Sequence, residues 1–474
     1  MLIYPPGEIY QRGEDRCQIN VEASVANSLR ACNDLGYISS SLRKDGYEVF
    51  LKDYPAENLK LPDFLQDVKS QNPDVIFIST TNGSIFDDIK TANLIKQLNK
   101  DIIIILKGAV FFNIKEEILN SINLSDIDYL IGGESEFIAP VLIEAVFNDK
   151  KSVEQIQGIS YKKDGIWQTN NVISLCQDID SLLFPDRELM NNKLYTNPLT
   201  NKPMATIATS RGCPFECIYC LSPVISGTKI RYRSPISVFN EISECFNKYG
   251  INDFFFKSDT FTANKKRVFE LCDLIISSGL NKKINWCANS RVNTIDEETI
   301  IKMKTAGCSL IALGIESGSS ESLEKMKKGI TVEDSIKAVE LIKKHNIKIF
   351  GFYLIGFPWE TKKHFELTKK LMFKLDTDFI ELSIVTPFAG TPLFSMMFED
   401  DYKHVFGKDS FKYIYETDKN ISLEELIKYR KQVILEYHLR LSYILKKLFC
   451  SKITPELLFS YIKYGIRMIK NNIF

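Results

Sequence analysis

The chain has 474 residues, with 60 Lys and Arg against 60 Asp and Glu, 45% hydrophobic residues and 25% charged residues. This length predicts roughly two to four domains, and the apolar content excludes an intrinsically disordered chain. The balanced charge argues against a dedicated nucleic-acid binder, whose binding face would be broadly basic. We find neither a membrane-length apolar run nor a secretory signal, so we expect a cytoplasmic protein whose 11 cysteines are thiols or metal ligands.

Strand-like runs alternate with helix-patterned segments in residues 1–150. The runs are Leu2–Tyr4, Tyr47–Leu51, Val75–Ser79, Ile102–Leu106 and Tyr129–Ile131. Between the first two, apolar residues recur at helical spacing from Leu35 to Asp45. The alternation predicts an α/β domain with a doubly wound, Rossmann-like parallel sheet, an architecture that binds flat cofactors above its strand ends.

A second alternating series occupies residues 196–395. The periodicity is weak in residues 151–195, which we interpret as a linker. Six strand and helix units then predict a partial (β/α)6 barrel. Its strand candidates are Ala205–Thr209, Phe254–Lys257, Ile284–Asn289, Leu310–Ile315, Ile349–Ile355 and Ile380–Val385. Residues 396–474 are predicted to form a helical C-terminal cap, in which residues 423–474 carry ten Lys and Arg against four Asp and Glu.

Three cysteines follow the first strand of this second series, where an α/β barrel places its chemistry. Cys213, Cys217 and Cys220 have the spacing C-x3-C-x2-C. Thiolates this close select zinc or an iron–sulfur cluster. A structural zinc needs a fourth ligand, and because no histidine precedes His345, it would have to recruit a distant residue such as Cys245. A cubane cluster can use three thiolates and leave one iron open for substrate, so the pattern favours iron–sulfur.

The cysteine spacing, with aromatic Tyr219 before the last cysteine, resembles that of the radical S-adenosylmethionine (SAM) enzymes. The resemblance implies that the three cysteines hold a 4Fe-4S cluster, whose open iron is chelated by the amino and carboxylate groups of SAM. It continues along the barrel in strand order. The segments that carry it are Phe256–Thr262, Trp286–Arg291, Ala306–Gly318, Gly356–Thr361 and Pro387–Thr391. Two positions depart from the family pattern, with Ser258 in place of an Asp and Trp359 in place of a Gly.

The resemblance also implies which residues bind SAM, and most of them stand at or just past the end of a predicted strand. These cofactor-binding candidates are Tyr219, Ser258, Asp259, Arg291, Glu316, Ser317, Gly356 and Pro358. Structural roles are the alternative for some of them. Arg291 and Glu316 can form an ion pair, Ser258 can cap a turn, and Tyr219 can simply pack.

An α/β domain before such a core resembles the cobalamin-binding branch of the family, in which many members are methyltransferases and others make or rearrange rings. Members that ligate cobalt with histidine carry Asp-x-His-x-x-Gly after the first strand, but residues 1–150 contain no histidine. A bound corrin would therefore leave its lower cobalt face to water or to another side chain. A domain that has lost cobalamin is the alternative.

Smaller features of the N-terminal region allow two interpretations each. The glycine-bearing segments 80–84 and 131–135 can cradle a corrin or form ordinary turns. The charged run 12–16 can contact phosphate or substrate, or form a solvated loop. Cys17 and Cys32 are predicted to be buried thiols rather than ligands.

The sequence as a whole predicts a cobalamin-dependent radical SAM enzyme that methylates or rearranges an unactivated carbon of an unidentified small-molecule or lipid substrate. The resemblance implies a flavodoxin- or ferredoxin-type electron donor. A tRNA methylthiotransferase shares the Arg-Gly-Cys motif but needs three N-terminal cysteines for a second cluster, and only Cys17, Cys32 and Cys176 precede the core.

A non-catalytic alternative is a metal-stapled interaction protein. It would use the basic C-terminal helices on RNA or for peripheral contact with an anionic membrane. The same run of charges is also typical of a solvated helical face.

Overall fold

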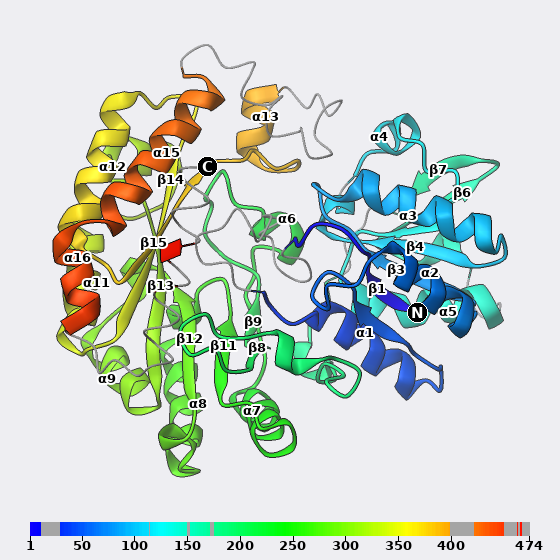
Figure 1. Ribbon diagram of the computed structural model, residues 1–474, viewed down its shortest axis with the longest axis horizontal. Coiled ribbons are helices and arrows are strands. Elements are labelled where there is room, and N and C mark those ends of the chain that lie inside the picture. The colour runs from blue at the N-terminus through cyan, green and yellow to red at the C-terminus, as the bar shows by residue number, and fades with distance from the viewer. Residues whose placement is uncertain are drawn as a thin grey trace.

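The computed structural model describes residues 1–10, 29–112, 114–148, 152–170, 175–398 and 421–449, together with residues 462, 465 and 466. Two α/β bodies lie side by side, an N-terminal domain and a larger barrel (Figure 1). The charged run 12–16 and Cys17 lie outside the described residues.

A seven-stranded sheet with the order β2-β1-β3-β4-β5-β6-β7 forms the N-terminal domain. Its parallel strands are β1 (Leu2–Tyr4), β2 (Leu51–Asp53), β3 (Val75–Ser79), β4 (Ile103–Lys107) and β5 (Tyr129–Ile131). Its helices are α1 (Asn33–Lys44), α2 (Leu61–Gln71), α3 (Ile85–Leu98), α4 (Glu116–Ser121) and α5 (Ser135–Asn148). Both faces are covered, because Ile76 and Ile78 of β3 belong to one apolar core while Val75 and Phe77 belong to another. The predicted doubly wound parallel sheet is confirmed.

The same sheet continues beyond residue 150, into the segment predicted to be a linker. Strands β6 (Ile159–Lys163) and β7 (Ile166–Thr169) form an antiparallel hairpin, and β6 pairs with β5. Asp164 and Gly165 between them both have positive φ. An Asp-Gly pair of this kind makes the two-residue turn that matches the twist of a hairpin. The sheet of the N-terminal domain therefore ends near residue 170.

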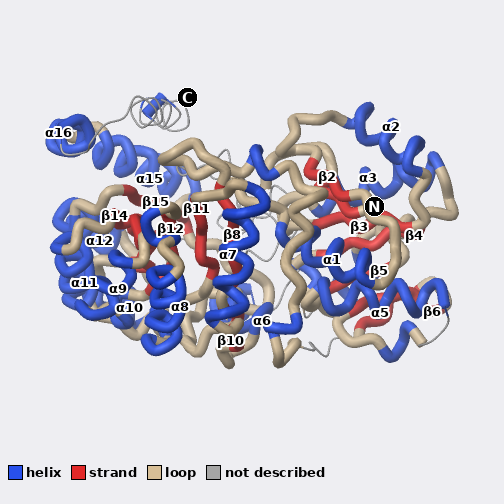
Figure 2. The backbone as a smooth tube through the Cα atoms, turned by 90° about the horizontal axis from the view of Figure 1, so that it is seen from below, coloured by secondary structure: helices blue, strands red, loops and turns tan. Residues whose placement is uncertain are grey.

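A six-stranded parallel sheet with the order β15-β14-β13-β12-β11-β8 forms the barrel. Its strands are β8 (Met204–Ala208), β11 (Asp253–Lys257), β12 (Asn285–Ser290), β13 (Cys308–Glu316), β14 (Lys348–Ile355) and β15 (Phe379–Ile384). Its helices are α7 (Pro235–Tyr249), α8 (Lys265–Ser277), α9 (Glu297–Thr305), α10 (Ser320–Lys325), α11 (Val332–Lys344) and α12 (Lys362–Leu375). The long helices lie outside the strands (Figure 2), which confirms the partial (β/α)6 barrel.

Shorter elements complete the two bodies. The ribbon strands β9 (Ser210–Arg211) and β10 (Arg231–Tyr232) pair antiparallel, with α6 (Ser222–Ser226) between them in the chain. The 3-10 turns are Ala109–Phe111, Val153–Gln155, Ile179–Ser181, Asn192–Leu194, Phe261–Ala263, Leu280–Lys282 and Val292–Thr294.

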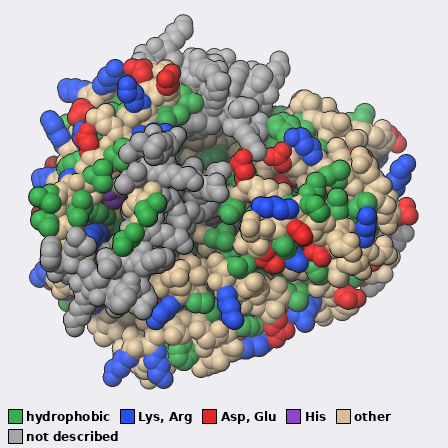
Figure 3. Space-filling model, in the orientation of Figure 1, with side chains coloured by type: hydrophobic (Ala, Val, Ile, Leu, Met, Phe, Trp, Pro, Cys, Tyr) green, Lys and Arg blue, Asp and Glu red, His purple; other side chains and the backbone are tan. Residues whose placement is uncertain are grey.

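The described part of the C-terminal region is helical, as predicted, with α13 (Pro392–Phe398), α15 (Leu423–His438) and α16 (Leu441–Phe449). Part of its positive charge is already paired with the barrel. Arg440 and Lys446 form ion pairs with Asp376, and Lys447 forms one with Asp378. Within the described residues, no helix combines the length and apolar character needed to cross a membrane. Among the described side chains on the face shown in Figure 3, basic and acidic groups are interspersed without a broad basic patch.

His438, at the end of α15, should make stability depend on pH. Burial lowers its pKa to about 4, with Lys447 and Arg440 acting in the same direction. Between about pH 6.5 and about pH 4, the histidine is protonated in the unfolded chain but neutral in the folded protein. The free energy of unfolding should therefore fall by about 3 kcal/mol as the pH is lowered from about 6.5 to about 4. Denaturant unfolding at pH 7 and pH 4 checks this. His438→Asn keeps a donor for the Ile434 carbonyl and should lose this part of the pH dependence. An equal change in the free energy of unfolding between pH 7 and pH 4 in the variant and the wild type would contradict the prediction.

Candidate active site

The three predicted cysteines lie on one loop, residues 212–230, which we call the cysteine loop. The paired strands β9 and β10 close its base, directly after β8. Gly212 at its start has a positive φ of 93°, and a Cβ there would clash with the carbonyl of Lys229. Only glycine fits this entry. Cys213 and Cys217 are buried and Cys220 is half-buried, and none of the three is in a disulfide.

Among the described residues, no three His, Cys, Asp or Glu side chains are gathered closely enough to hold one metal ion. The chemistry of the donor set nevertheless fits a cluster bound by three thiolates. Cys217 Sγ lies 3.6 Å from Arg291 Nη1, and Cys220 Sγ accepts from the Ser222 N–H at 3.4 Å. Cys245, the fourth ligand that zinc would need, is buried on α7, where burial raises its pKa to about 11. It is poorly suited to act as a thiolate ligand.

Arg291 connects the cysteine loop to the end of β12. Its guanidinium lies over the Phe215 ring at 3.6 Å from the centroid, and its Nη2 donates to the Lys328 carbonyl. Arg291 is not the partner of Glu316 in the ion pair considered as an alternative. That partner is Lys328, whose Nζ lies 2.6 Å from Glu316 Oε1.

Glu316 occupies an unusual backbone position at the end of β13. Its φ is 66°, and the register with β14 shifts between Gly314 and Glu316. A non-glycine residue in this region costs free energy and is often found at functional sites. Its carboxylate is buried with Lys328, whose Nζ is 3.4 Å from the Tyr219 hydroxyl. Burial raises the pKa of Tyr219, and the negative charge of the neighbouring Glu316 raises it further.

The residues after β11 face the N-terminal domain. Ser258 Oγ lies 2.7 Å from Ser210 Oγ and accepts from the Thr260 N–H, so it caps the turn as the alternative interpretation held. Asp259 Oδ2 accepts from Ser222 Oγ at 2.6 Å. This contact ties the end of β11 to the cysteine loop.

The remaining candidates shape the far side of the barrel mouth. The Gly356 N–H donates to Glu360 Oε2 at 2.9 Å, which holds the Gly356 to Pro358 turn closed. Phe357 of this turn packs edge-on against Tyr219. Ser317 is fully buried and bonds to Thr368 at 3.1 Å, so its hydroxyl supports the backbone rather than opening toward the mouth.

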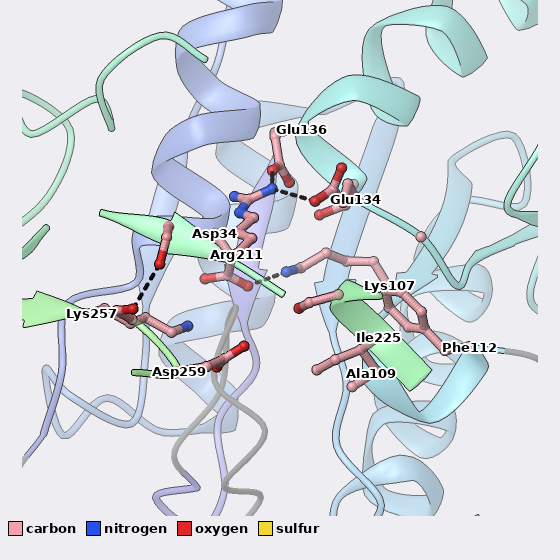
Figure 4. A pocket seen from close by; sticks show the side chains of 16 residues that line it. Asp34, Lys107, Ala109, Phe112, Glu134, Glu136, Arg211, Ile225, Lys257 and Asp259 are labelled. Carbon is pink, nitrogen blue, oxygen red and sulfur yellow. Dashed lines mark hydrogen bonds and ion pairs between the residues drawn. The ribbon is translucent and has the colours of Figure 1, made fainter. Parts of the chain in front are cut away.

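A pocket lies between the two bodies (Figure 4). The ends of β4 and β5 supply one wall, including Lys107 and Glu134, and the N-terminus of α1 adds Asp34. The ends of β8 and β11 supply the other wall, including Arg211 and Asp259. The carboxyl ends of both sheets therefore face one space, the position at which open α/β sheets and barrels bind ligands.

Of the two glycine segments considered for a cradle, residues 131–135 contribute to this pocket. Gly133, Glu134 and Ser135 line it, whereas none of the described lining residues comes from 80–84. Gly83 instead lies under the Tyr10 ring, where a Cβ would meet the ring. Cys32 is buried and bonds to the Tyr195 hydroxyl at 3.3 Å, as a structural thiol.

A buried ion pair between Asp34 and Lys107 lines the pocket, and no pattern in the sequence indicated it. The carboxylate accepts from Lys107 Nζ, from the Tyr4 hydroxyl at 2.6 Å and from Ser79 Oγ at 3.1 Å. Burial by itself would raise the pKa of Asp34, but Lys107 and Tyr4 outweigh it, and the pKa is lowered.

Lys107→Met should lower the free energy of unfolding by about 3 kcal/mol, because it leaves the Asp34 carboxylate buried without its cation. Urea denaturation of the cofactor-free protein measures this loss. Adding Asp34→Asn should recover part of the loss, since the uncompensated charge is then gone. An equal or greater loss in the double variant would show that the cost has another source.

Two known families match the chain. Residues 207–372 match the radical SAM superfamily, and residues 33–143 match the B12 binding domain. An uncharacterized methyltransferase of Pyrococcus horikoshii is 31% identical over 88% of this chain and 89% of its own length. An anaerobic magnesium-protoporphyrin IX monomethyl ester cyclase of Cereibacter sphaeroides is 25% identical, covering 80% of this chain and 62% of its own length.

Solved structures share the fold. The radical S-adenosylmethionine methyltransferase TsrM of Kitasatospora setae, with cobalamin and a [4Fe-4S] cluster bound, superposes with a TM-score of 0.69 at 18% identity, over 84% of this chain and 77% of that one. The cobalamin-dependent S-adenosylmethionine radical enzyme OxsB gives 0.68 at 16% identity, over 93% and 69%.

Proposed function

The chain belongs to the radical SAM superfamily and carries a B12-binding domain, and from that premise we propose that it is a cobalamin-dependent radical SAM methyltransferase. The interdomain pocket is the observation that carries the proposal. Residues of the B12-binding domain and residues next to the cysteine loop line the same space. Two cofactors bound to the two bodies would therefore meet there.

In this proposal Cys213, Cys217 and Cys220 hold a 4Fe-4S cluster. When bound, the cluster supplies the electron that cleaves SAM, and cobalamin carries the methyl group. Arg291 supports the cluster side through Phe215 and Cys217.

The same proposal assigns the residues around the barrel mouth to SAM. Asp259, Glu316 and Tyr219 present polar groups there, and Gly356 and Pro358 shape the adjoining turn. Ser258 and Ser317 act through the backbone turns that they hold. Orientation of SAM by these groups would decide which of its carbon–sulfur bonds receives the electron.

A cobalamin bound here would lack a histidine ligand from this chain's N-terminal domain. Within the described residues that line the pocket there is no histidine. Of the four histidines, His345 contacts Glu297, His364 contacts Glu321 and His438 is buried on α15, while His404 lies outside the described residues. We therefore expect spectra of the bound corrin to show no histidine-nitrogen ligation.

The substrate of the proposed reaction is an unidentified small molecule, and a flavodoxin- or ferredoxin-type protein supplies the electron. Peripheral membrane contact is supported by α16, on which Leu441 is 70% exposed and Leu445 is 41% exposed. If these side chains dock on a bilayer, Leu441→Glu should abolish cosedimentation with anionic vesicles. Binding equal to that of the wild type would reject the contact.

Anaerobic purification, reconstitution with iron and sulfide, and addition of hydroxocobalamin test the proposed function. About four irons and one corrin per chain, with conversion of SAM to 5′-deoxyadenosine or S-adenosylhomocysteine, are the expected result. Four irons without corrin would leave a radical SAM enzyme with a degenerate N-terminal domain. About eight irons would indicate a methylthiotransferase, and zinc in place of iron would overturn the assignment.

A further inference from the structure

Two arginines face each other at the base of the cysteine loop. In the ribbon of β9 and β10, Arg211 pairs directly with Arg231. Both side chains are buried, with 9% and 3% of their surface exposed. Like charges directly opposite each other destabilise a strand pair, and a buried cation without a counter-charge is costly. The base of the loop therefore needs a carboxylate from elsewhere.

Glu134 of the N-terminal domain supplies that carboxylate. Its Oε1 lies 3.0 Å from Arg211 Nη1 and 2.8 Å from Arg231 Nη1, so one side chain holds both ends of the cysteine loop. Glu136 adds a second contact to Arg211 (Figure 4). The Cys176 N–H donates to Glu134 Oε2 at 2.8 Å, which fixes the carboxylate from the other side.

The backbone that carries Glu134 has little freedom to move. It directly follows Gly132 and Gly133, between β5 and α5. A Cβ on Gly132 would clash with the carbonyl of Phe111, so the turn is pressed against the segment that follows β4. The same turn lines the interdomain pocket. Glu134 is thus anchored to the wall of the pocket on one side and to the cysteine loop on the other.

We propose that Glu134 is a positioning residue that fixes the cysteine loop, through Arg211 and Arg231, at a set place over the interdomain pocket. The consequence for the reaction rests on the proposed function, in which the loop carries a cluster and the pocket holds a corrin. Reacting groups must be held within a fraction of an ångström for efficient transfer. One carboxylate from the B12-binding domain sets the position of the loop that the barrel contributes.

Glu134→Gln tests this in the full-length reconstituted enzyme. Gln keeps the shape of the side chain and loses its charge, so amide hydrogen exchange in residues 210–232 should become about tenfold faster or more. The electron paramagnetic resonance spectrum of the reduced cluster should broaden, because the loop then occupies several positions. Glu134→Asp keeps the charge and should give an intermediate exchange rate.

Asp53→Asn is the matched control. Asp53 is also a buried carboxylate of the N-terminal domain, and it accepts at 3.0 Å from the hydroxyl of Tyr195, in the segment that connects the two bodies. It touches neither arginine of the ribbon, so exchange of the cysteine loop and the cluster spectrum should stay as in the wild type. The proposal would be overturned if amide hydrogen exchange of the cysteine loop were unchanged in Glu134→Gln, or if it became equally fast in Asp53→Asn.

Arg231→Gln adds a test of the route. If Glu134 acts through Arg231, amide hydrogen exchange of the cysteine loop in the variant with both substitutions should be little faster than in Glu134→Gln alone. Additive increases in the exchange rate would contradict a shared role. This series also stands if Glu134→Gln folds poorly, since Glu134→Asp and Arg231→Gln report on the same contact. Failure of the wild type to bind corrin would remove the proposed function, while the exchange rates would still decide the role of Glu134.

Discussion

Replacement of any one of Cys213, Cys217 and Cys220 by alanine should reduce conversion of SAM to 5′-deoxyadenosine to the level of a blank without enzyme. The three thiols stand on a single loop, and Cys245 is buried on α7, so a lost ligand has no nearby substitute there. Removing an outer-shell partner of a metal site typically costs 10-fold to about 100-fold, so loss of a direct ligand should exceed that. Iron per chain and 5′-deoxyadenosine formation, measured anaerobically on the same samples, check the prediction.

Cys176→Ala is the matched control for these variants. Cys176 is a partly exposed thiol that bonds to the Asp178 carbonyl, outside the cysteine loop. Its replacement should leave iron content and turnover unchanged, because only its backbone contacts Glu134 and Arg231. Wild-type turnover in any of the three loop variants would refute the cluster assignment. Loss of iron in Cys176→Ala would point instead to a second cluster.

Both sheets could be predicted from the sequence because their strands are buried on two faces. Such strands read as short apolar runs, as in β3 and β4, and their order along the chain follows from the alternation with helices. The hairpin of β6 and β7 is less apolar, and Lys162 and Lys163 obscure its alternation. The Asp164-Gly165 turn was the available signal for it.

Only those site residues that lie within a sequence motif could be predicted. Motifs place Cys213, Arg291 and Glu316 at strand ends, and the parallel topology brings those ends together. The partners across the fold leave no local pattern. Lys328 is separated from its partner Glu316 by the helix α10, and Glu134 is 77 positions away from its partner Arg211 in the sequence. The first pairing depends on packing within the barrel and the second on where the two bodies meet, so periodicity and spacing contain no record of either. The binding of one cluster by the three sulfurs also stays a prediction.

Glu316→Gln should lower kcat/KM for SAM cleavage by about 100-fold, mainly through a higher KM for SAM, while iron per chain stays unchanged. The reason is the position of the carboxylate. It is buried at the end of β13, in a left-handed conformation beside Lys328 and near Tyr219. Within the described part of the chain its ion pair is with Lys328, not with a cysteine of the loop. Initial rates of 5′-deoxyadenosine formation across a range of SAM concentrations measure the effect.

The pairing with Lys328 makes it possible to separate binding from stability. Glu316→Gln alone leaves Lys328 buried without its counter-charge, which destabilises the fold as well as the site. Adding Lys328→Met removes the uncompensated charge, so the double variant should regain stability but keep the high KM if the carboxylate itself binds SAM. Glu241→Gln breaks another buried pair of the barrel, with Arg187 and Arg233, and should cost stability without raising KM. Recovery of KM in the double variant would make Glu316 a purely structural partner of Lys328.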